Sequence, residues 1–263
     1  MFTTYFKMTR HPFCERTPIN QILKDERITQ GLARLEYLAQ EGTIALLTGP
    51  TGVGKSSLLK LFLHSLSKNQ FHPLYLHLTH LSSVSFLKLI VHGLGEIPKR
   101  GKERLFLQIL DKAQTNELST LLVIDEAHLL DPDAMTDLRL LVSSALEEMP
   151  PLKIILSGQE TLRDQLKRSA HSDLVHRICV RYQMPPFSKD QTAAYIDFQL
   201  QQTGASEKTF EPEVKSLIHD YTRGIPRQIN NLATACLIQA ASRKTQRITE
   251  DLFHETLGEF QLP

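Results

Sequence analysis

The sequence predicts an α/β fold, in which helices cover both faces of a parallel sheet, followed by a smaller helical domain. Up to residue 187, short apolar runs alternate with helical patterns, and a glycine-rich loop joins the first run to a helix. After Pro185 and Pro186 only helical patterns remain. Alternation of this kind is typical of parallel sheets. We therefore expect a core domain at residues 1–187 and a helical lid at residues 188–263.

Five apolar runs are expected to form a five-stranded parallel sheet, at residues 43–47, 73–78, 121–125, 152–157 and 178–184. Helical spacing of apolar residues predicts helices between them, at residues 57–66, 83–93, 103–113 and 133–148. In the lid, Ser188 and Gln191 form a capping box for a helix that Gly204 ends. Further helix starts are indicated by Pro212, Pro226 and Thr249.

Composition limits the classes of protein that this chain can belong to. Hydrophobic and charged residues make up 41% and 22%, and 30 basic residues face 29 acidic ones. A balanced charge excludes a polycation, so contact with nucleic acid would need a local basic patch. The spacing of Cys14, Cys179 and Cys236 predicts neither a zinc site nor a disulfide framework. No apolar run approaches the ~20 residues of a membrane span, and we expect a cytoplasmic protein without a membrane partner.

The glycine-rich loop at residues 49–56 matches the pattern GxxxxGK(S/T), between a strand and a helix. Its backbone N–H groups and the helix N-terminus would bind the phosphates of a nucleoside triphosphate. Lys55 would bridge the β- and γ-phosphates, and the hydroxyl of Ser56 would bind Mg²⁺. The residues expected to hold ATP are Gly49, Pro50, Thr51, Gly52, Val53, Gly54, Lys55, Ser56 and Ser57.

Two carboxylates, Asp125 and Glu126, end the third apolar run. Asp125 would hold Mg²⁺ through water, and Glu126 would orient the water that attacks the γ-phosphate. A protein that only binds the nucleotide does not need the second acid, so Glu126 predicts hydrolysis. Residues 125–128 also spell the motif of DEAH helicases, but those enzymes need two motor domains, for which this chain is too short.

With these motifs, the chain resembles the AAA+ ATPases over nearly its whole length. Residues 222–232, Thr-Arg-Gly-Ile-Pro-Arg-Gln-Ile-Asn-Asn-Leu, look like the sensor-2 segment of the initiator-like branch. The resemblance implies that Arg227 reaches from the lid to the γ-phosphate. It also implies a sensor-1 residue at the end of the fourth strand, where Ser157 and Gln159 are both candidates.

AAA+ ATPases assemble into rings in which one subunit inserts an arginine into the next subunit's site. The resemblance places this finger just before the fifth strand, at Arg177. The rival candidates are Arg163, Arg168 and Arg181. Because such fingers supply ~10³–10⁵ in rate, a lone subunit would hydrolyse ATP poorly.

Residues 5–13, Tyr-Phe-Lys-Met-Thr-Arg-His-Pro-Phe, are similar to the opening of the ExeA/GspA-like ATPases, which have relatives of the TniB, TnsC, MuB and IstB transposition kind. Lys7 and Met8 depart from the glycine and leucine common there. The resemblance places Pro12 and Phe13 near the adenine. A satellite hydrophobic cluster is the alternative interpretation of this segment.

The transposition relatives assemble on double-stranded DNA as rings or helical filaments and recruit a transposase or another recombination protein. The same arrangement here would hold DNA with two loops, at residues 79–83 and 98–102. The candidate DNA-binding residues are His80, Ser83, Lys99, Arg100 and Lys102. No aromatic residue lies among these basic side chains, which favours duplex over single-stranded DNA.

Three functions are compatible with the sequence. The first is an ATP-dependent DNA-binding regulator of transposition, because the chain is too short for a secretion ATPase's membrane anchor or an initiator's winged helix. The second is an ExeA-like ATPase of a secretion or envelope machine. The third is a nucleotide-gated protein-binding switch in which hydrolysis is slow.

Overall fold

The computed structural model describes residues 1–14, 17–77, 80–143 and 152–260. The chain divides into two compact units. The sheet unit comprises residues 26–51 and 55–184, and the helical unit comprises residues 1–25, 52–54 and 185–263. Leu78, Thr79, the end of the helix expected to reach residue 148, and Pro263 lie outside the described residues.

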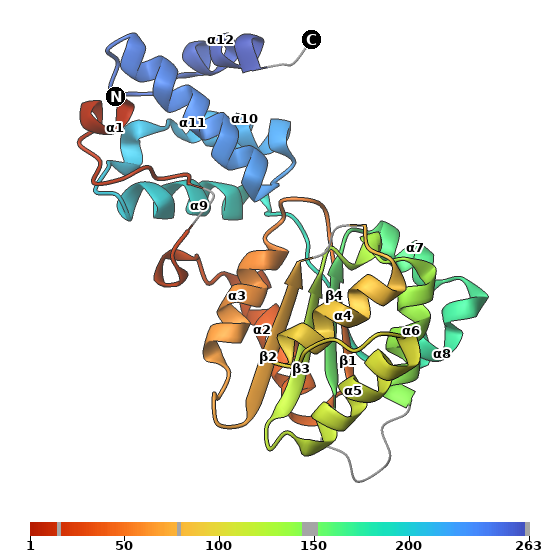
Figure 1. Ribbon diagram of the computed structural model, residues 1–263. Coiled ribbons are helices and arrows are strands. Elements are labelled where there is room, and N and C mark those ends of the chain that lie inside the picture. The colour runs from red at the N-terminus through yellow and green to blue at the C-terminus, as the bar shows by residue number, and fades with distance from the viewer. Residues whose placement is uncertain (15–16, 78–79, 144–151, 261–263) are drawn as a thin grey trace. The chain divides into compact units, whose positions relative to one another are not determined.

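The sheet unit contains five strands and their connecting helices (Figure 1). The strands are β1 (Ile44–Thr48), β2 (Phe71–His77), β3 (Ser119–Asp125), β4 (Lys153–Gly158) and β5 (Ile178–Gln183). The longer helices are α2 (Glu26–Glu41), α3 (Lys55–Ser65), α4 (Ser83–Gly93), α5 (Lys102–Thr115) and α6 (Pro132–Ser143). Short helices follow, at η2 (Ala127–Leu129), α7 (Thr161–Leu166), η3 (Ser169–His171) and α8 (Ser172–His176).

All the strand pairs are parallel, in the order β2-β3-β4-β1-β5, which confirms the predicted α/β fold. The three central strands are buried along nearly their whole length, whereas exposed residues alternate with more buried ones in the edge strands β2 and β5. This difference explains the sequence pattern, since a central strand of a covered sheet is apolar on both faces. The parallel arrangement brings the carboxyl ends of β1, β3 and β4 to one edge, where the glycine-rich loop and both carboxylates lie.

Helices cover both faces of the sheet. Side chains of α4 to α8 form one large cluster with alternate residues of the strands, including Leu46, Ile124 and Leu156. On the opposite face, α2 packs against α3 and β5. A Cβ on Gly31 of α2 would lie 2.5 Å from the Leu58 side chain, so only glycine allows this close approach.

The helical unit is formed by α1 (Phe2–Tyr5), η1 (Ile19–Gln21), α9 (Lys189–Gln201), η4 (Glu207–Thr209), α10 (Pro212–Thr222), α11 (Pro226–Ser242) and α12 (Glu250–Phe260). The predicted capping box of Ser188 and Gln191 is present at the start of α9. Gly204 follows α9 with φ of 77°, as a helix-ending glycine does. Within the described residues, no helix combines the length and the apolar character that crossing a bilayer requires.

The N-terminal segment belongs to the helical unit, which differs from the expected division at residue 187. Phe6, Met8 and Phe13 are buried in the apolar cluster formed by α9 to α12. The Phe13 ring meets Phe210 edge-on, with 6.4 Å between centroids. Burial of these three large apolar side chains explains why residues 1–25 group with the C-terminal helices. In the sequence, the strands of the sheet unit lie between the two segments.

Candidate nucleotide-binding site

The glycine-rich loop begins after β1 and ends where α3 starts at Lys55. Gly49, Gly52 and Gly54 have φ values of 156°, 80° and 113°, which residues with a Cβ rarely adopt. These conformations let a short loop turn sharply from the strand into the helix. The N-terminus of α3 then carries partial positive charge, which favours an anion.

The Lys55 side chain is buried and runs back over the loop. Its Nζ donates hydrogen bonds to the carbonyl oxygens of Gly49, at 2.9 Å, and Pro50, at 3.0 Å. The loop therefore holds a positive charge beside the N-terminus of α3. Both features attract an anionic ligand such as the phosphates of a nucleotide.

Asp125 is the centre of the site, at the end of β3 and only 1% exposed. Its Oδ1 accepts hydrogen bonds from the Ser157 hydroxyl at 2.8 Å and from the backbone N–H of Glu126 at 3.1 Å. Its Oδ2 accepts from the hydroxyls of Tyr75 at 2.7 Å and Ser56 at 2.9 Å. The fold thus brings together on one carboxylate residues from α3, β2 and β4, because the strands end at a common edge.

Mg²⁺ fits the chemistry of this donor set. The Ser56 hydroxyl and the Asp125 carboxylate, 2.9 Å apart, are the oxygen donors that Mg²⁺ prefers. In the described part of the chain, no group of three or more His, Cys, Asp or Glu residues could hold a metal. The pair of Ser56 and Asp125 suits Mg²⁺ because this ion keeps several waters and shares its coordination with phosphates.

Tyr75 is a residue of the site that sequence reasoning missed. Burial, followed by the hydrogen bond with Asp125, raises the pKa of its hydroxyl, so the hydroxyl stays protonated and donates to the carboxylate. The signal in the sequence was the alternation of β2, which places Tyr75 and His77 on one face. Only the register of β2 against β3 shows that this face is the one on which Asp125 lies.

Glu126 turns the chain out of β3 in a left-handed conformation, with φ of 59°. Its Oε2 lies 3.5 Å from Nδ1 of His128, which has no hydrogen-bond partner among the described residues. Gln165 of α7 donates to the His128 carbonyl at 2.9 Å. A Cβ on Gly158 would lie 3.3 Å from the His128 backbone nitrogen. His128, also missed by sequence reasoning, is therefore held closely beside the carboxylate predicted to orient water.

The two sensor-1 candidates occupy different environments. Ser157 is fully buried on β4 and bonds Asp125 directly. Gln159 follows the strand and is partly exposed. The geometry brings Ser157 to the carboxylate centre, whereas the structure shows no contact between Gln159 and Asp125.

The four arginines considered as the finger are all exposed. Arg163 donates to the Gln183 side chain at 2.6 Å, and Arg181 donates to the Val175 carbonyl at 3.1 Å. In the described residues, the side chains of Arg177 and Arg168 make no hydrogen bond or ion pair. Arg177 lies between α8 and β5, just before the fifth strand, and its side chain is exposed.

Arg227, the predicted sensor 2, is the second residue of α11. Its backbone N–H donates to the Gly52 carbonyl at 3.3 Å, and both residues belong to the helical unit. Phe13, expected near the adenine, is instead 4% exposed within the apolar cluster of that unit. The satellite cluster, left open above, is thus the interpretation that the packing of Phe13 favours.

Two of the residues expected to bind DNA are engaged inside the sheet unit. Ser83 is buried, and its hydroxyl donates to Oδ2 of Asp137 on α6. Lys102 pairs with Oδ1 of the same carboxylate at 2.9 Å. These two residues anchor the starts of α4 and α5, because Asp137 is buried and needs compensation, and their contact with DNA stays a prediction.

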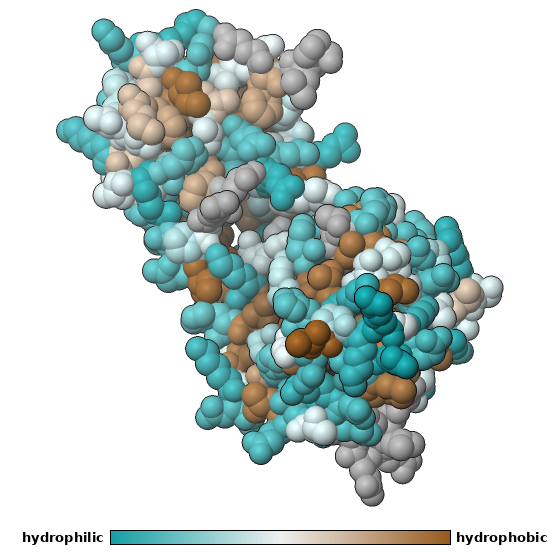
Figure 2. All heavy atoms as spheres, viewed as in Figure 1, coloured by the Kyte–Doolittle hydropathy of each residue, from teal (hydrophilic) through white to brown (hydrophobic). Residues whose placement is uncertain are grey.

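The other three expected DNA contacts, His80, Lys99 and Arg100, are exposed. Figure 2 shows a largely polar surface on the face drawn, with apolar side chains in small groups. Ile97 is 87% exposed and lies close in sequence to the two basic residues. The loop before α5 thus presents two cations and one exposed apolar side chain.

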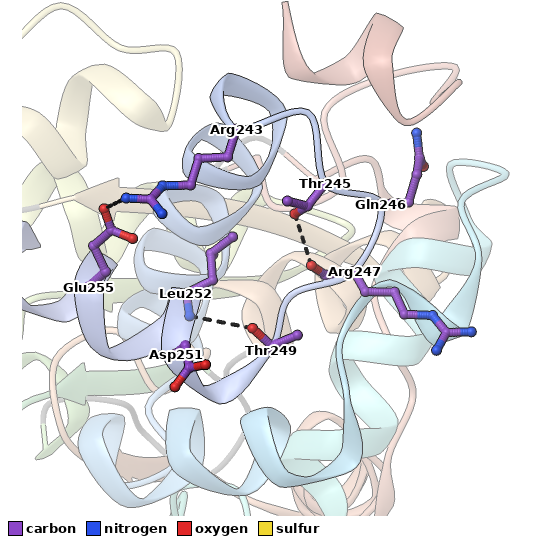
Figure 3. Close-up of a pocket in the computed structure, with 8 residues that line it drawn as sticks. All are labelled: Arg243, Thr245, Gln246, Arg247, Thr249, Asp251, Leu252 and Glu255. Carbon is purple, nitrogen blue, oxygen red and sulfur yellow. Dashed lines mark hydrogen bonds and ion pairs between the residues drawn. The ribbon is translucent and has the colours of Figure 1, made fainter.

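One pocket of about 450 Å³ lies in the helical unit, between the end of α11 and α12 (Figure 3). It is lined by Arg243, Thr245, Gln246, Arg247, Thr249, Asp251, Leu252 and Glu255. None of these is a predicted site residue. Arg243 pairs with Glu255, and the Thr249 hydroxyl accepts from the Leu252 N–H at 3.5 Å. Several of the side chains that line the pocket therefore already make interactions that stabilise α12.

Comparison with known proteins supports the same nucleotide-binding architecture. Residues 38–166 match the family model described as an AAA domain. Over 255 residues the chain is 30% identical to general secretion pathway protein A of Aeromonas hydrophila. The match covers 94% of this chain and 46% of that protein, so the chain spans about half the length of this relative.

Solved structures share the fold at low sequence identity. The Aeropyrum pernix ORC1 protein in complex with DNA has a TM-score of 0.73 at 15% identity, covering 96% of this chain and 70% of that one. The Cdc6p protein of Pyrobaculum aerophilum has a TM-score of 0.74 at 18% identity, covering 96% and 72%. Together with the sheet order and the glycine-rich loop, these matches show that the chain has the fold of AAA+ P-loop ATPases and that residues 38–166 are similar to an AAA domain.

Proposed function

We propose that this protein is a Mg²⁺-dependent ATPase that binds ATP at residues 49–57. The observation that carries the proposal is the convergence of Ser56 and Ser157 on Asp125, 2.9 and 2.8 Å away. The two proposed Mg²⁺ ligands, Ser56 and Asp125, are thereby in contact with each other, and Glu126 follows Asp125 in the chain. Similarity of residues 38–166 to an AAA domain supports nucleotide hydrolysis in general, and the contacts around Asp125 support the roles proposed here for particular residues.

Each residue would contribute a separate part of the reaction. The loop N–H groups and Lys55 bind the β- and γ-phosphates, which fixes the γ-phosphate for in-line attack. Ser56 and Asp125 would hold Mg²⁺, which would supply positive charge against the charge that develops on the phosphates. Glu126 accepts a hydrogen bond from the attacking water and orients it. Ser157 donates to Asp125 and keeps that carboxylate turned toward Ser56.

Two arginines would complete the site in an assembly of several copies. Arg227 would contact the γ-phosphate from the helical unit, and Arg177 would enter the site of a neighbouring copy. The positive charge of such an arginine finger stabilises the transition state of phosphoryl transfer and increases the rate by a factor of ~10³–10⁵. The exposed guanidinium of Arg177, without a partner among the described residues, supports this role.

The test separates binding from hydrolysis. Lys55→Ala should abolish binding of a fluorescent ATP analogue, whereas Glu126→Gln should retain binding and lose phosphate release. Lys88→Ala on the exposed side of α4 is the matched control and should behave as the native protein does. An unchanged nucleotide affinity in Lys55→Ala would refute the phosphate-loop role.

The ATPase would drive ATP-dependent binding to duplex DNA in the cytoplasm, as a ring or filament that regulates a transposase. Exposed His80, Lys99 and Arg100 support phosphate contacts, and the likeness to ORC1 in complex with DNA is consistent with them. Electron microscopy with a nonhydrolysable ATP analogue should then show assemblies that grow on duplex DNA. DNA binding that does not depend on nucleotide would count against this function.

The secretion relative favours a second candidate, an ATPase of a secretion or envelope machine. Identity of 30% over 94% of this chain is the specific observation behind it. Under this reading, the ATP-bound protein should co-purify with a membrane partner and should assemble equally with or without duplex DNA. The same microscopy experiment therefore separates the two candidates.

A further inference from the structure

Tyr75 lies on β2, one strand away from Asp125. The register pairs Tyr75 with Val123 and His77 with Asp125. Side chains two residues apart on a strand share a face, so Tyr75 and Asp125 are diagonal neighbours on the same face. A diagonal separation of this kind is within reach of a long aromatic side chain.

The Tyr75 hydroxyl makes the shortest of the four hydrogen bonds to Asp125, at 2.7 Å. It shares Oδ2 with Ser56, while Ser157 and the Glu126 N–H bind Oδ1. Hydrogen bonds thus hold both oxygens of the carboxylate: Tyr75 of β2 binds Oδ2, and Ser157 of β4 binds Oδ1. Without Tyr75, only the Ser56 hydroxyl would remain on Oδ2, and Ser56 is itself expected to turn toward the metal.

The position of Tyr75 indicates that its hydroxyl, rather than its ring, is the important group. The side chain is on an edge strand and the residue is 41% exposed, so ring burial contributes little to the core. His77 is nearby, but its Nδ1 lies 3.9 Å from Oδ2, beyond hydrogen-bond distance. Among the β2 side chains, the tyrosine therefore supplies the close contact with the carboxylate.

We propose that Tyr75 is a positioning residue for Asp125, which holds Oδ2 toward Ser56 and so raises the affinity for the Mg²⁺ that accompanies the nucleotide. The proposal rests on the function proposed above. Groups that orient a metal ligand typically change metal affinity by about 10–100-fold when they are removed. Tyr75 would act on the metal-dependent part of nucleotide binding and leave the metal-free part unchanged.

The experiment uses Tyr75→Phe, which removes one oxygen and retains the ring. Binding of a fluorescent ATP analogue is measured in EDTA and then across a Mg²⁺ titration. We expect affinity in EDTA to match the native protein, and the Mg²⁺ concentration at half-saturation to rise about tenfold. Tyr37→Phe is the matched control, because Tyr37 lies on α2, is 54% exposed and makes no hydrogen bond in the described structure.

Hydrolysis provides a second readout: the half-saturating Mg²⁺ concentration for phosphate release should rise similarly, with kcat at saturating Mg²⁺ largely kept. An unchanged Mg²⁺ half-saturation in Tyr75→Phe overturns the proposal. An equal loss of affinity in EDTA also overturns it, because the hydroxyl would then serve the nucleotide or the fold. If the native protein binds no nucleotide in either condition, the proposed function fails as well; if it binds with Mg²⁺ and the variant is indistinguishable, only this inference fails.

Discussion

Lys102 Nζ lies 2.9 Å from Oδ1 of Asp137, so the first residue of α5 is paired with a buried carboxylate on α6. The Ser83 hydroxyl at the start of α4 binds the other oxygen of this carboxylate. One acidic side chain therefore joins three helices on the same face of the sheet. Two of the residues that the sequence predicts to bind DNA, Ser83 and Lys102, therefore also connect α4 and α5 to α6.

Replacing Lys102 should lower stability. Lys102→Ala leaves the Asp137 carboxylate without its cation, and we expect a loss of about 1–3 kcal/mol in the free energy of unfolding, below the value for a fully buried pair because Lys102 is half-exposed. Urea denaturation measures it. Lys99→Ala, which breaks no ion pair in the described residues, should stay within about 0.5 kcal/mol of the native protein. Equal stability of the two variants would contradict the supporting role of the pair.

The same pair changes the expected DNA-binding surface. If Lys99 and Arg100 each contact one phosphate, replacing both by alanine should reduce the slope of log affinity against log salt by about 1.8. Adding Lys102→Ala should change the slope little further, since that amine is already paired. The measurement is a salt titration of duplex binding with a nonhydrolysable ATP analogue. A slope that the double variant leaves unaltered would remove the loop from the interface.

Crowding His128 should slow hydrolysis. In Gly158→Ala the new Cβ would lie 3.0 Å from Leu162 Cδ2 and 3.3 Å from the His128 nitrogen. His128 would have to shift, and Glu126 with it, so we expect kcat to fall about tenfold or more with nucleotide affinity retained. Gly258→Ala on α12 has nothing within 4 Å of the added Cβ and is the control. Steady-state kinetics that match in both variants would exclude the coupling.

Lys153 should be important for folding. Its buried Nζ donates to the carbonyl oxygens of Gly42 at 2.8 Å, Leu38 at 3.2 Å and Gln40 at 3.4 Å, which end α2. Lys153→Met removes these bonds, including the donor to the buried Gly42 carbonyl, so we expect a loss of about 2–4 kcal/mol in unfolding free energy. Lys88→Met on the surface of α4 should change it little. Thermal or urea unfolding measures both variants, and equal stability of Lys153→Met and Lys88→Met would contradict the role of the Lys153 hydrogen bonds.

Stability should fall in mild acid because of His171. Burial, and then the charges of Arg168 and Arg139, lower the pKa of His171 from its usual 6.5. The unfolded chain therefore takes up a proton near pH 6.5 while the folded chain resists it, so this contribution is complete above pH 6.5 and decreases as pH falls below it. The native protein should lose more stability between pH 7 and pH 5 than His171→Gln does. Parallel pH profiles in urea denaturation would contradict this origin.

Much of the fold could be predicted from short-range patterns. The runs at residues 43–47 and 121–125 each differ from the observed strand by a few residues at most, because continuous apolar sequence is what a central strand needs. The loop at residues 49–56 and the capping box of Ser188 and Gln191 are equally local, since backbone angles and neighbouring side chains determine them. Glycine adopts positive φ because it has no Cβ to clash with the backbone. A hydroxyl at a helix start accepts a hydrogen bond from a backbone N–H that has no partner within the helix.

By itself, therefore, the sequence determined the parallel sheet, the phosphate loop and the position of the two carboxylates at a strand end. Tertiary structure alone decided which side chains meet Asp125 and Asp137, and that Phe13 packs with the C-terminal helices. Strand register and helix packing place Tyr75 beside a carboxylate 50 residues away, and Ser83 and Lys102 on one buried acid. Such contacts depend on the burial of distant segments against one another, which no local pattern encodes.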